Sequence, residues 1–115
     1  MVNKYGAKKT EYRGVVYDSK WEAQKAYELD MLQRAGKITD LQRQVPFVLQ
    51  ERYVNNEGDS IRPIFYVADF YYYDVKMKMW VVMDTKGYAT DVYKIKRKIF
   101  MFKYPKIKFI EAHKM

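Results

Sequence analysis

The chain has 115 residues, enough for one domain with its own core, and hydrophobic residues make up 49% of it. It has no cysteine, which excludes disulfides and thiolate metal sites, and no apolar run suggests a membrane span or a signal peptide. With 22 lysine and arginine residues against 14 aspartate and glutamate residues, the net charge is +8, so we expect a polyanionic partner, nucleic acid first, and a cytoplasmic location.

The first third of the chain predicts an arm, a strand and a helix. Residues 1–11 are polar and basic, and we expect a flexible N-terminal arm there, with residues 12–115 forming one domain. Residues 12–17 are rich in β-branched side chains, which indicates a short strand. A helix is expected to begin after Ser19, a good N-cap residue, and to end at Gly36.

The remaining segments alternate between extended chain and one more helix. Pro46 lies in an extended segment and indicates either an edge position in the sheet or a bend, because proline cannot donate to a strand ladder. In chain order we expect extended chain over 38–54, strands over 61–74 and 79–86, a helix over 91–104 and a strand over 106–112. Helix, three strands, helix and strand indicate an α/β (α+β) fold with a mixed sheet flanked by helices.

Two acids occupy matching places in the two central strands. If these strands form a hairpin centred between Lys76 and Met77, Asp69 stands opposite Asp84 with Cβ atoms ~5 Å apart. Like charges so placed destabilise a sheet unless a divalent cation lies between them, and oxygen ligands suit Mg²⁺. Lys86 points to the same face as Asp84. The turn lacks an Asn-Gly signal, so the sequence alone leaves the register open.

The pattern of Asp69 followed by Asp84-Thr85-Lys86 on the next strand resembles the PD-(D/E)XK nuclease superfamily, some branches of which add a glutamate on the first helix, where Glu22 stands. The chain also resembles short phage and prophage proteins of unknown function, and more distantly the junction-resolving phage endonuclease I. The matching segments are 3–12, 18–23, 44–47, 67–72, 84–87 and 91–98. Two departures are Ala68, where the superfamily motif has proline, and aspartate as the third acid in place of glutamate.

The resemblance implies a restriction-endonuclease-like αβββαβ core and a Mg²⁺-dependent DNA endonuclease, with branched or Holliday-junction DNA as a candidate substrate. Glu22, Asp69 and Asp84 would hold Mg²⁺, with Mn²⁺ able to substitute, and Lys86 would orient the attacking water or neutralise charge on the phosphate. The alternative is a non-catalytic DNA-binding protein that keeps the fold. A homodimer is expected, because two copies can cut two strands, and a phage-encoded protein would work in the host cytoplasm.

Three cations on the second expected helix are spaced for one side of it, and we expect them to contact DNA phosphates. The other interpretation of this pattern is that the three cations lie on a helix face that contacts only solvent. The basic N-terminal region offers a second set of cations. The expected DNA-binding residues are Lys94, Arg97 and Lys98 on the helix, and Lys8, Lys9 and Arg13 near the N-terminus.

Two assignments stay open on sequence alone. Glu22 lies three residues after Ser19, so its side chain could complete a capping box in place of binding a metal. Gln44 could lie beside the metal site or be an ordinary strand residue.

Overall fold

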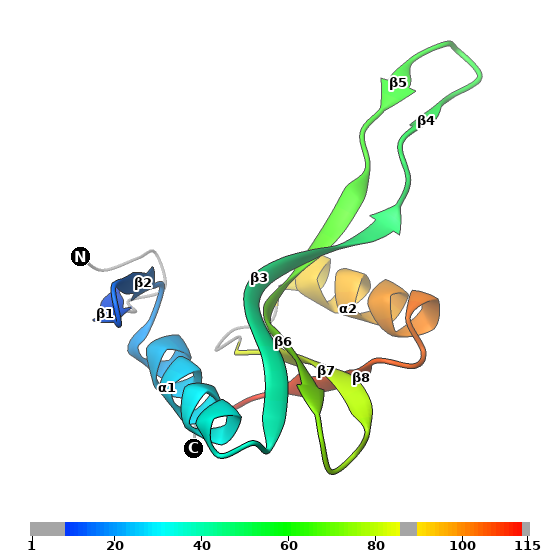
Figure 1. Ribbon diagram of the computed structural model, residues 1–115. Helices are drawn as coiled ribbons and strands as arrows, with labels where there is room; N and C mark the ends of the chain where they lie inside the picture. The colour runs from blue at the N-terminus through cyan, green and yellow to red at the C-terminus, as the bar shows by residue number, and fades with distance from the viewer. Residues whose placement is uncertain (1–8, 86–89, 114–115) are drawn as a thin grey trace.

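The computed structural model describes residues 9–85 and 90–113, and the expected order of elements is confirmed in it. A four-stranded mixed sheet lies between two helices (Figure 1). These elements are α1 (Lys20–Arg34), β3 (Ile38–Gln50), β6 (Ile64–Asp74), β7 (Met79–Asp84), α2 (Asp91–Lys103) and β8 (Lys108–Glu111). Two small hairpins are added to this core: β1 (Thr10–Tyr12) with β2 (Val15–Tyr17), and β4 (Tyr53–Val54) with β5 (Ser60–Ile61).

The sheet has the strand order β3-β6-β7-β8, with the last pair parallel and the others antiparallel. β6 and β7 pair from Asp74↔Met79 to Phe70↔Met83, which is the register expected for a turn centred between residues 76 and 77. β3 is an edge strand, one of the two possibilities that its proline indicated, because β6 is its only neighbour in this sheet.

The core is split between the two faces of the sheet. Val81 and Val82 are both fully buried, and because neighbouring strand residues point to opposite faces, each belongs to a different cluster. The Val81 cluster includes small and branched side chains of α1, and the Val82 cluster includes aromatic side chains of α2. The α1 residues are Ala23, Ala26 and Leu29, and the α2 residues are Tyr93 and Phe100.

Apolar residues that recur at helical spacing over residues 91–104 form a stripe on α2, and this stripe does not face the sheet. The helix begins after Thr90, whose side chain accepts a hydrogen bond from the backbone N–H of Tyr93 at 3.1 Å. Tyr93 and Phe100, seven residues apart, are the side chains that α2 buries. The stripe is exposed, with Phe102 at 88%, and its members are Val92, Ile95, Ile99 and Phe102.

The single strand expected over residues 12–17 is a hairpin. Arg13 and Gly14 both have positive φ, at 51° and 81°, which is the backbone of a tight two-residue turn. The strand β1 begins at Thr10, so the last two residues assigned to the flexible arm belong to this hairpin. The hairpin packs on α1, where the ring of Tyr12 makes an edge contact with that of Tyr27 at 5.8 Å.

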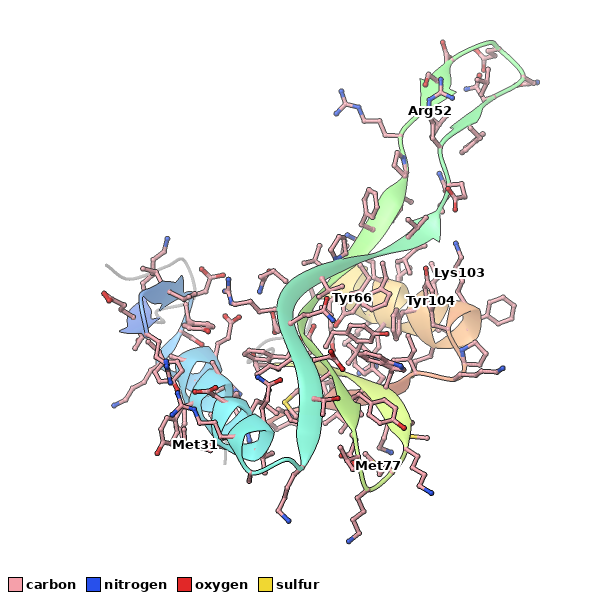
Figure 2. The ribbon with its side chains drawn as sticks, in the orientation of Figure 1. Met31, Arg52, Tyr66, Met77, Lys103 and Tyr104 are labelled. Carbon is pink, nitrogen blue, oxygen red and sulfur yellow. The ribbon has the colours of Figure 1, made fainter. Side chains whose placement is uncertain are left out.

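A long ribbon projects from the body of the molecule. β3 and β6 continue past the core and end in the β4–β5 hairpin, on which Arg52 lies far from Tyr66 of the core (Figures 1 and 2). The radius of gyration is 16.1 Å, against about 13 Å for a compact chain of about this size. Among the described helices none is both long and apolar enough to span a membrane.

Candidate active site

The polar side chains that are buried in the described part of the chain lie together at one place. They are Glu22, Asp69, Asp84 and Thr85, exposed by 6%, 8%, 0% and 7% respectively. Glu22 comes from the first turn of α1, Asp69 from β6, and Asp84 and Thr85 from the end of β7. The pairing of β6 with β7 stops at Phe70↔Met83, so Asp69 and Asp84 are the first residues beyond the ladder. We call Glu22, Asp69 and Asp84 the acid cluster.

The start of α1 turns the carboxylate of Glu22 inward. The Ser19 hydroxyl accepts a hydrogen bond from the backbone N–H of Glu22 at 3.0 Å and so caps the helix. The Glu22 carboxylate accepts a hydrogen bond from the Gln44 amide at 3.3 Å, and the same amide donates to Asp69 at 3.4 Å. Ser19 therefore supplies the cap, while the Glu22 carboxylate is directed to Gln44 and is linked through it to Asp69.

Gln44 has a backbone conformation that is unusual for a strand. Its φ is 55°, in the left-handed region that non-glycine residues rarely adopt. In the register of β3 with β6, the pairs on either side of it are Arg43↔Phe70 and Val45↔Ala68. Such strain persists only where surrounding contacts fix it, and here the contacts of the side chain are the carboxylates of Glu22 and Asp69.

Two residues that the sequence did not single out hold the acids in place. Thr85 donates to one oxygen of Asp69 from both its backbone N–H, at 2.8 Å, and its hydroxyl, at 2.9 Å. The hydroxyl of Tyr66 donates to Asp84 at 2.6 Å. Thr85 lies inside the Asp-Thr-Lys motif, which is the signal that could have identified it, whereas nothing near Tyr66 in the sequence marks it.

Negative charge is concentrated at this place. The pKa of Glu22 is raised to about 7, first by burial, then by the charge of Asp69 and that of Asp18, while Arg43 lowers it. Burial also raises the pKa of Tyr66, and the charges of Asp84 and Asp69 raise it further, so both carboxylates lie near its hydroxyl. An added cation would relieve this repulsion.

The donor atoms fit a hard divalent cation. Three carboxylates supply only oxygen, which Mg²⁺ prefers, and Mg²⁺ is commonly held by one or two carboxylates with water and phosphate completing its shell. Across residues 9–85 and 90–113, no three acidic or histidine side chains form a ready-made metal group. The fit is therefore to an ion held by one or two members of the acid cluster. Lys86, the fourth expected residue, lies outside the described residues.

The expected DNA-binding cations have different surroundings. Lys94 and Lys98 on α2 and Lys9 near the N-terminus are exposed, and Lys8 lies outside the described residues. Arg97 instead forms an ion pair with Glu111 at 2.6 Å, and Tyr93 donates to the same carboxylate at 2.5 Å.

These two contacts, the Tyr93 hydrogen bond first, lower the pKa of Glu111. Arg97 therefore already has an anionic partner within the chain. Arg13 also has one, because it pairs with Asp30 at 3.1 Å, although 56% of its side chain remains exposed.

The family described as "Protein of unknown function (DUF1064)" matches residues 2–115. The chain belongs to this family. No curated protein and no solved structure matches it.

Proposed function

We propose that this member of the DUF1064 family is a metal-dependent DNA endonuclease that uses the acid cluster to hydrolyse phosphodiester bonds. The observation that carries the proposal is the burial of Glu22, Asp69 and Asp84 at one end of the sheet. Buried carboxylates are costly unless they are paired or bind a metal, and the pKa of Glu22 remains raised to about 7 although the charge of Arg43 lowers it. The order αβββαβ and the Asp84-Thr85-Lys86 sequence agree with the PD-(D/E)XK resemblance.

In this proposal each residue of the cluster has a distinct task. Asp69, with Glu22 or Asp84, would hold Mg²⁺ or Mn²⁺; when bound, such an ion polarises the phosphate and lowers the pKa of a bound water. Thr85 and Gln44 fix the direction of the Asp69 carboxylate, and Tyr66 fixes that of Asp84.

Lys86 is assigned from the sequence alone. It follows Asp84 by two residues, and we propose that its ammonium orients the attacking water or stabilises charge that develops on the phosphate.

We assign DNA contact to the exposed cations. Lys94 and Lys98 lie on α2, and Lys9 and Arg13 lie near the β1–β2 hairpin, so phosphates could be held on either side of the acid cluster. Arg97 contributes less, because binding a phosphate would mean leaving Glu111. The net charge of +8 favours a polyanion over other partners, and the cytoplasm is the proposed location.

We also propose a homodimer. Two exposed apolar surfaces support it, since a monomer rarely leaves contiguous apolar surface of this kind uncovered. One is the α2 stripe, and the other lies on the projecting ribbon and consists of Tyr53, Val54, Ile64, Phe65 and Val67. The ribbon carries acidic residues beside its basic ones, and the acids Glu51, Glu57 and Asp59 would repel DNA phosphates. The ribbon therefore suits a protein partner better than DNA.

The test is incubation of the purified protein with linear, supercoiled, single-stranded and four-way-junction DNA, in Mg²⁺, Mn²⁺ or EDTA. We expect cleavage of at least one substrate with either metal and none in EDTA. Asp84→Asn should lose cleavage and keep DNA binding. The matched control is Asp74→Asn, because Asp74 is the last residue of β6, away from the acid cluster, and accepts a hydrogen bond from the backbone N–H of Met77.

Two results would overturn the proposal. One is DNA binding without cleavage of any substrate in either metal, which is the behaviour of a non-catalytic DNA-binding protein. The other is cleavage by Asp84→Asn at the wild-type rate, which would place the chemistry elsewhere.

A further inference from the structure

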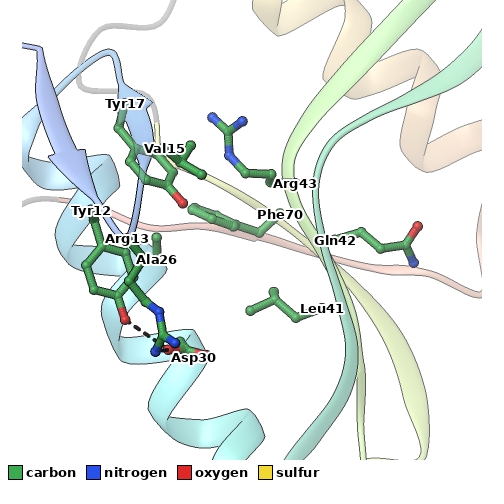
Figure 3. Close-up of a pocket in the computed structure, with 10 residues that line it drawn as sticks. All are labelled: Tyr12, Arg13, Val15, Tyr17, Ala26, Asp30, Leu41, Gln42, Arg43 and Phe70. Carbon is green, nitrogen blue, oxygen red and sulfur yellow. Dashed lines mark hydrogen bonds and ion pairs between the residues drawn. The ribbon is translucent and has the colours of Figure 1, made fainter.

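A cavity of about 200 Å³ opens between the β1–β2 hairpin, α1 and the sheet (Figure 3). Aromatic rings form much of its wall, with Tyr12 and Tyr17 from the hairpin and Phe70 from β6. Val15 and Leu41 add aliphatic surface. The cavity is smaller than those that hold drug-sized ligands, and its walls suit one flat ring system.

Hydrogen-bonding groups lie at the rim of this cavity. Asp30 accepts from the Tyr12 hydroxyl at 2.9 Å and from Arg13 at 3.1 Å, as Figure 3 shows. On the other side, the guanidinium of Arg43 lies over the ring of Tyr17, 4.6 Å from its centre. Flat apolar walls with donors and acceptors along one edge match the chemistry of a nucleobase, which stacks through its faces and forms hydrogen bonds through its edge.

The cavity adjoins the acid cluster. Phe70 directly follows Asp69 in β6, and Arg43 directly precedes Gln44, which donates to Glu22 and Asp69. The exposed cations Arg13 and Arg43 at the rim are complementary to the phosphates on either side of a bound base. A DNA strand whose phosphate reached the acids would therefore place a neighbouring nucleotide at the cavity.

We propose that this cavity binds one unpaired nucleobase of the DNA next to the bond that is cut, which makes DNA with unpaired bases the preferred substrate class. The inference rests on the proposed nuclease function. A base inside a duplex is stacked and must be extruded at a cost of about a few kcal/mol, whereas a base at a bulge, branch or single-stranded segment enters freely. The preference for such DNA thus follows from the size and lining of the cavity, which suit one ring system, without any recognition of base sequence.

The test uses duplexes that carry 2-aminopurine, either in a one-nucleotide bulge or fully paired, in EDTA so that no cleavage occurs. We expect the full-length protein to quench the bulged fluorophore through stacking and to bind the bulged duplex at least about fivefold more tightly than the paired one. Val15→Trp fills the cavity and should remove both effects. Val16→Trp is the matched control, because Val16 is the next residue of β2, is 59% exposed and does not line the cavity.

Tyr12→Leu is a second variant, which removes a stacking ring without adding bulk. It should weaken binding to the bulged duplex by about fivefold or more and leave binding to the paired duplex within twofold. Thermal melting of each variant confirms that it is folded. Equal wild-type affinity for the two duplexes, or undiminished quenching by folded Val15→Trp, would overturn the inference.

A parallel reaction in Mg²⁺ separates this inference from the nuclease proposal. Quenching and preference for the bulged duplex without any cleavage would support the proposal that the cavity binds a base and would overturn the proposal that the protein is a nuclease. Cleavage of DNA without preference for the bulged duplex would overturn only the proposal that the cavity binds an unpaired base.

Discussion

Removing the charge of Glu22 should make the metal-free protein more stable at alkaline pH. The pKa of this carboxyl is about 7 in the folded chain against 4.5 for an ordinary glutamate, because burial and the charge of Asp69 oppose its ionisation. Each unit of difference corresponds to about 1.4 kcal/mol, so the ionised carboxylate costs the fold at most about 3 kcal/mol. That is a large share of the ~5–15 kcal/mol by which domains are stable.

The pH dependence follows from the direction of this shift. A group whose folded pKa is raised favours the folded state fully below its unfolded pKa, and this contribution is lost as the pH rises through the folded value. Wild-type protein should therefore lose stability between about pH 4.5 and 7 relative to Glu22→Gln. The two proteins should be similar at pH 4.5, and at pH 8 the variant should be more stable by up to about 3 kcal/mol.

The assay is urea denaturation in EDTA at several values of pH from 4.5 to 8. Glu28→Gln is the matched control, because Glu28 lies on the same helix with 43% of its side chain exposed and pairs with Lys25 at 3.0 Å. Its stability should follow the wild type at each pH. Adding Mn²⁺ at pH 8 should stabilise wild type, and it should stabilise Glu22→Gln less if Glu22 is one of the ligands. Parallel curves for wild type and Glu22→Gln would refute the reasoning that Glu22 is an uncompensated buried charge.

Three further predictions concern the neighbouring parts of the molecule. Thr85→Val, which removes the hydroxyl donor to Asp69, should slow cleavage by about tenfold while DNA affinity stays within twofold; an unchanged rate would mean that Asp69 needs no such support. Lys94→Ala should weaken DNA binding and reduce the log–log salt slope by ~0.9 in a titration series, and Arg97→Ala should change that slope less and instead lower the melting temperature. Equal slopes for the two variants would contradict the assignment of Arg97 to Glu111. Phe102→Asp should convert a dimer to a monomer in analytical ultracentrifugation without lowering the melting temperature, and a dimer that persists would move the interface off α2.

The parts of the fold that local pattern determines could be predicted from the sequence. Helix α1 follows from Ser19 and Gly36, and β6 pairs with β7 in the register that a turn centred between residues 76 and 77 gives, although the sequence alone left that register open. The β1–β2 hairpin could not be read in the same way. Its turn residues Arg13 and Gly14 lie inside a run that also fits one continuous strand, and only the positive φ values separate the two.

The face that a helix buries depends on partners distant in the sequence. Tyr93 and Phe100 face inward because they pack against an aromatic cluster on the sheet. The regularly spaced apolar stripe that ends at Phe102 is exposed to solvent instead. Arg97 lies on the same side of α2 as Lys94 by its spacing, yet its partner Glu111 comes from strand β8.

The acids of the candidate site could be selected because aspartate is unusual among strand residues. The groups that hold them were harder to select: the Tyr66 hydroxyl reaches Asp84 across 18 positions of sequence, and Gln44, for which the sequence left two interpretations open, reaches Asp69 across 25. Contacts of this kind arise from how the strands and α1 are placed, and a single sequence shows no local signal for them.

The measurement that tests the central claim most directly is a crystal structure with Mn²⁺, with data collected at the manganese absorption edge. The account predicts an anomalous peak at about 2 Å from a carboxylate oxygen of Asp69, in contact also with Glu22 or Asp84. Manganese bound only at surface acids such as Glu57, with Asp69 held by Gln44 and Thr85 alone, would contradict the claim that the acid cluster is a metal centre.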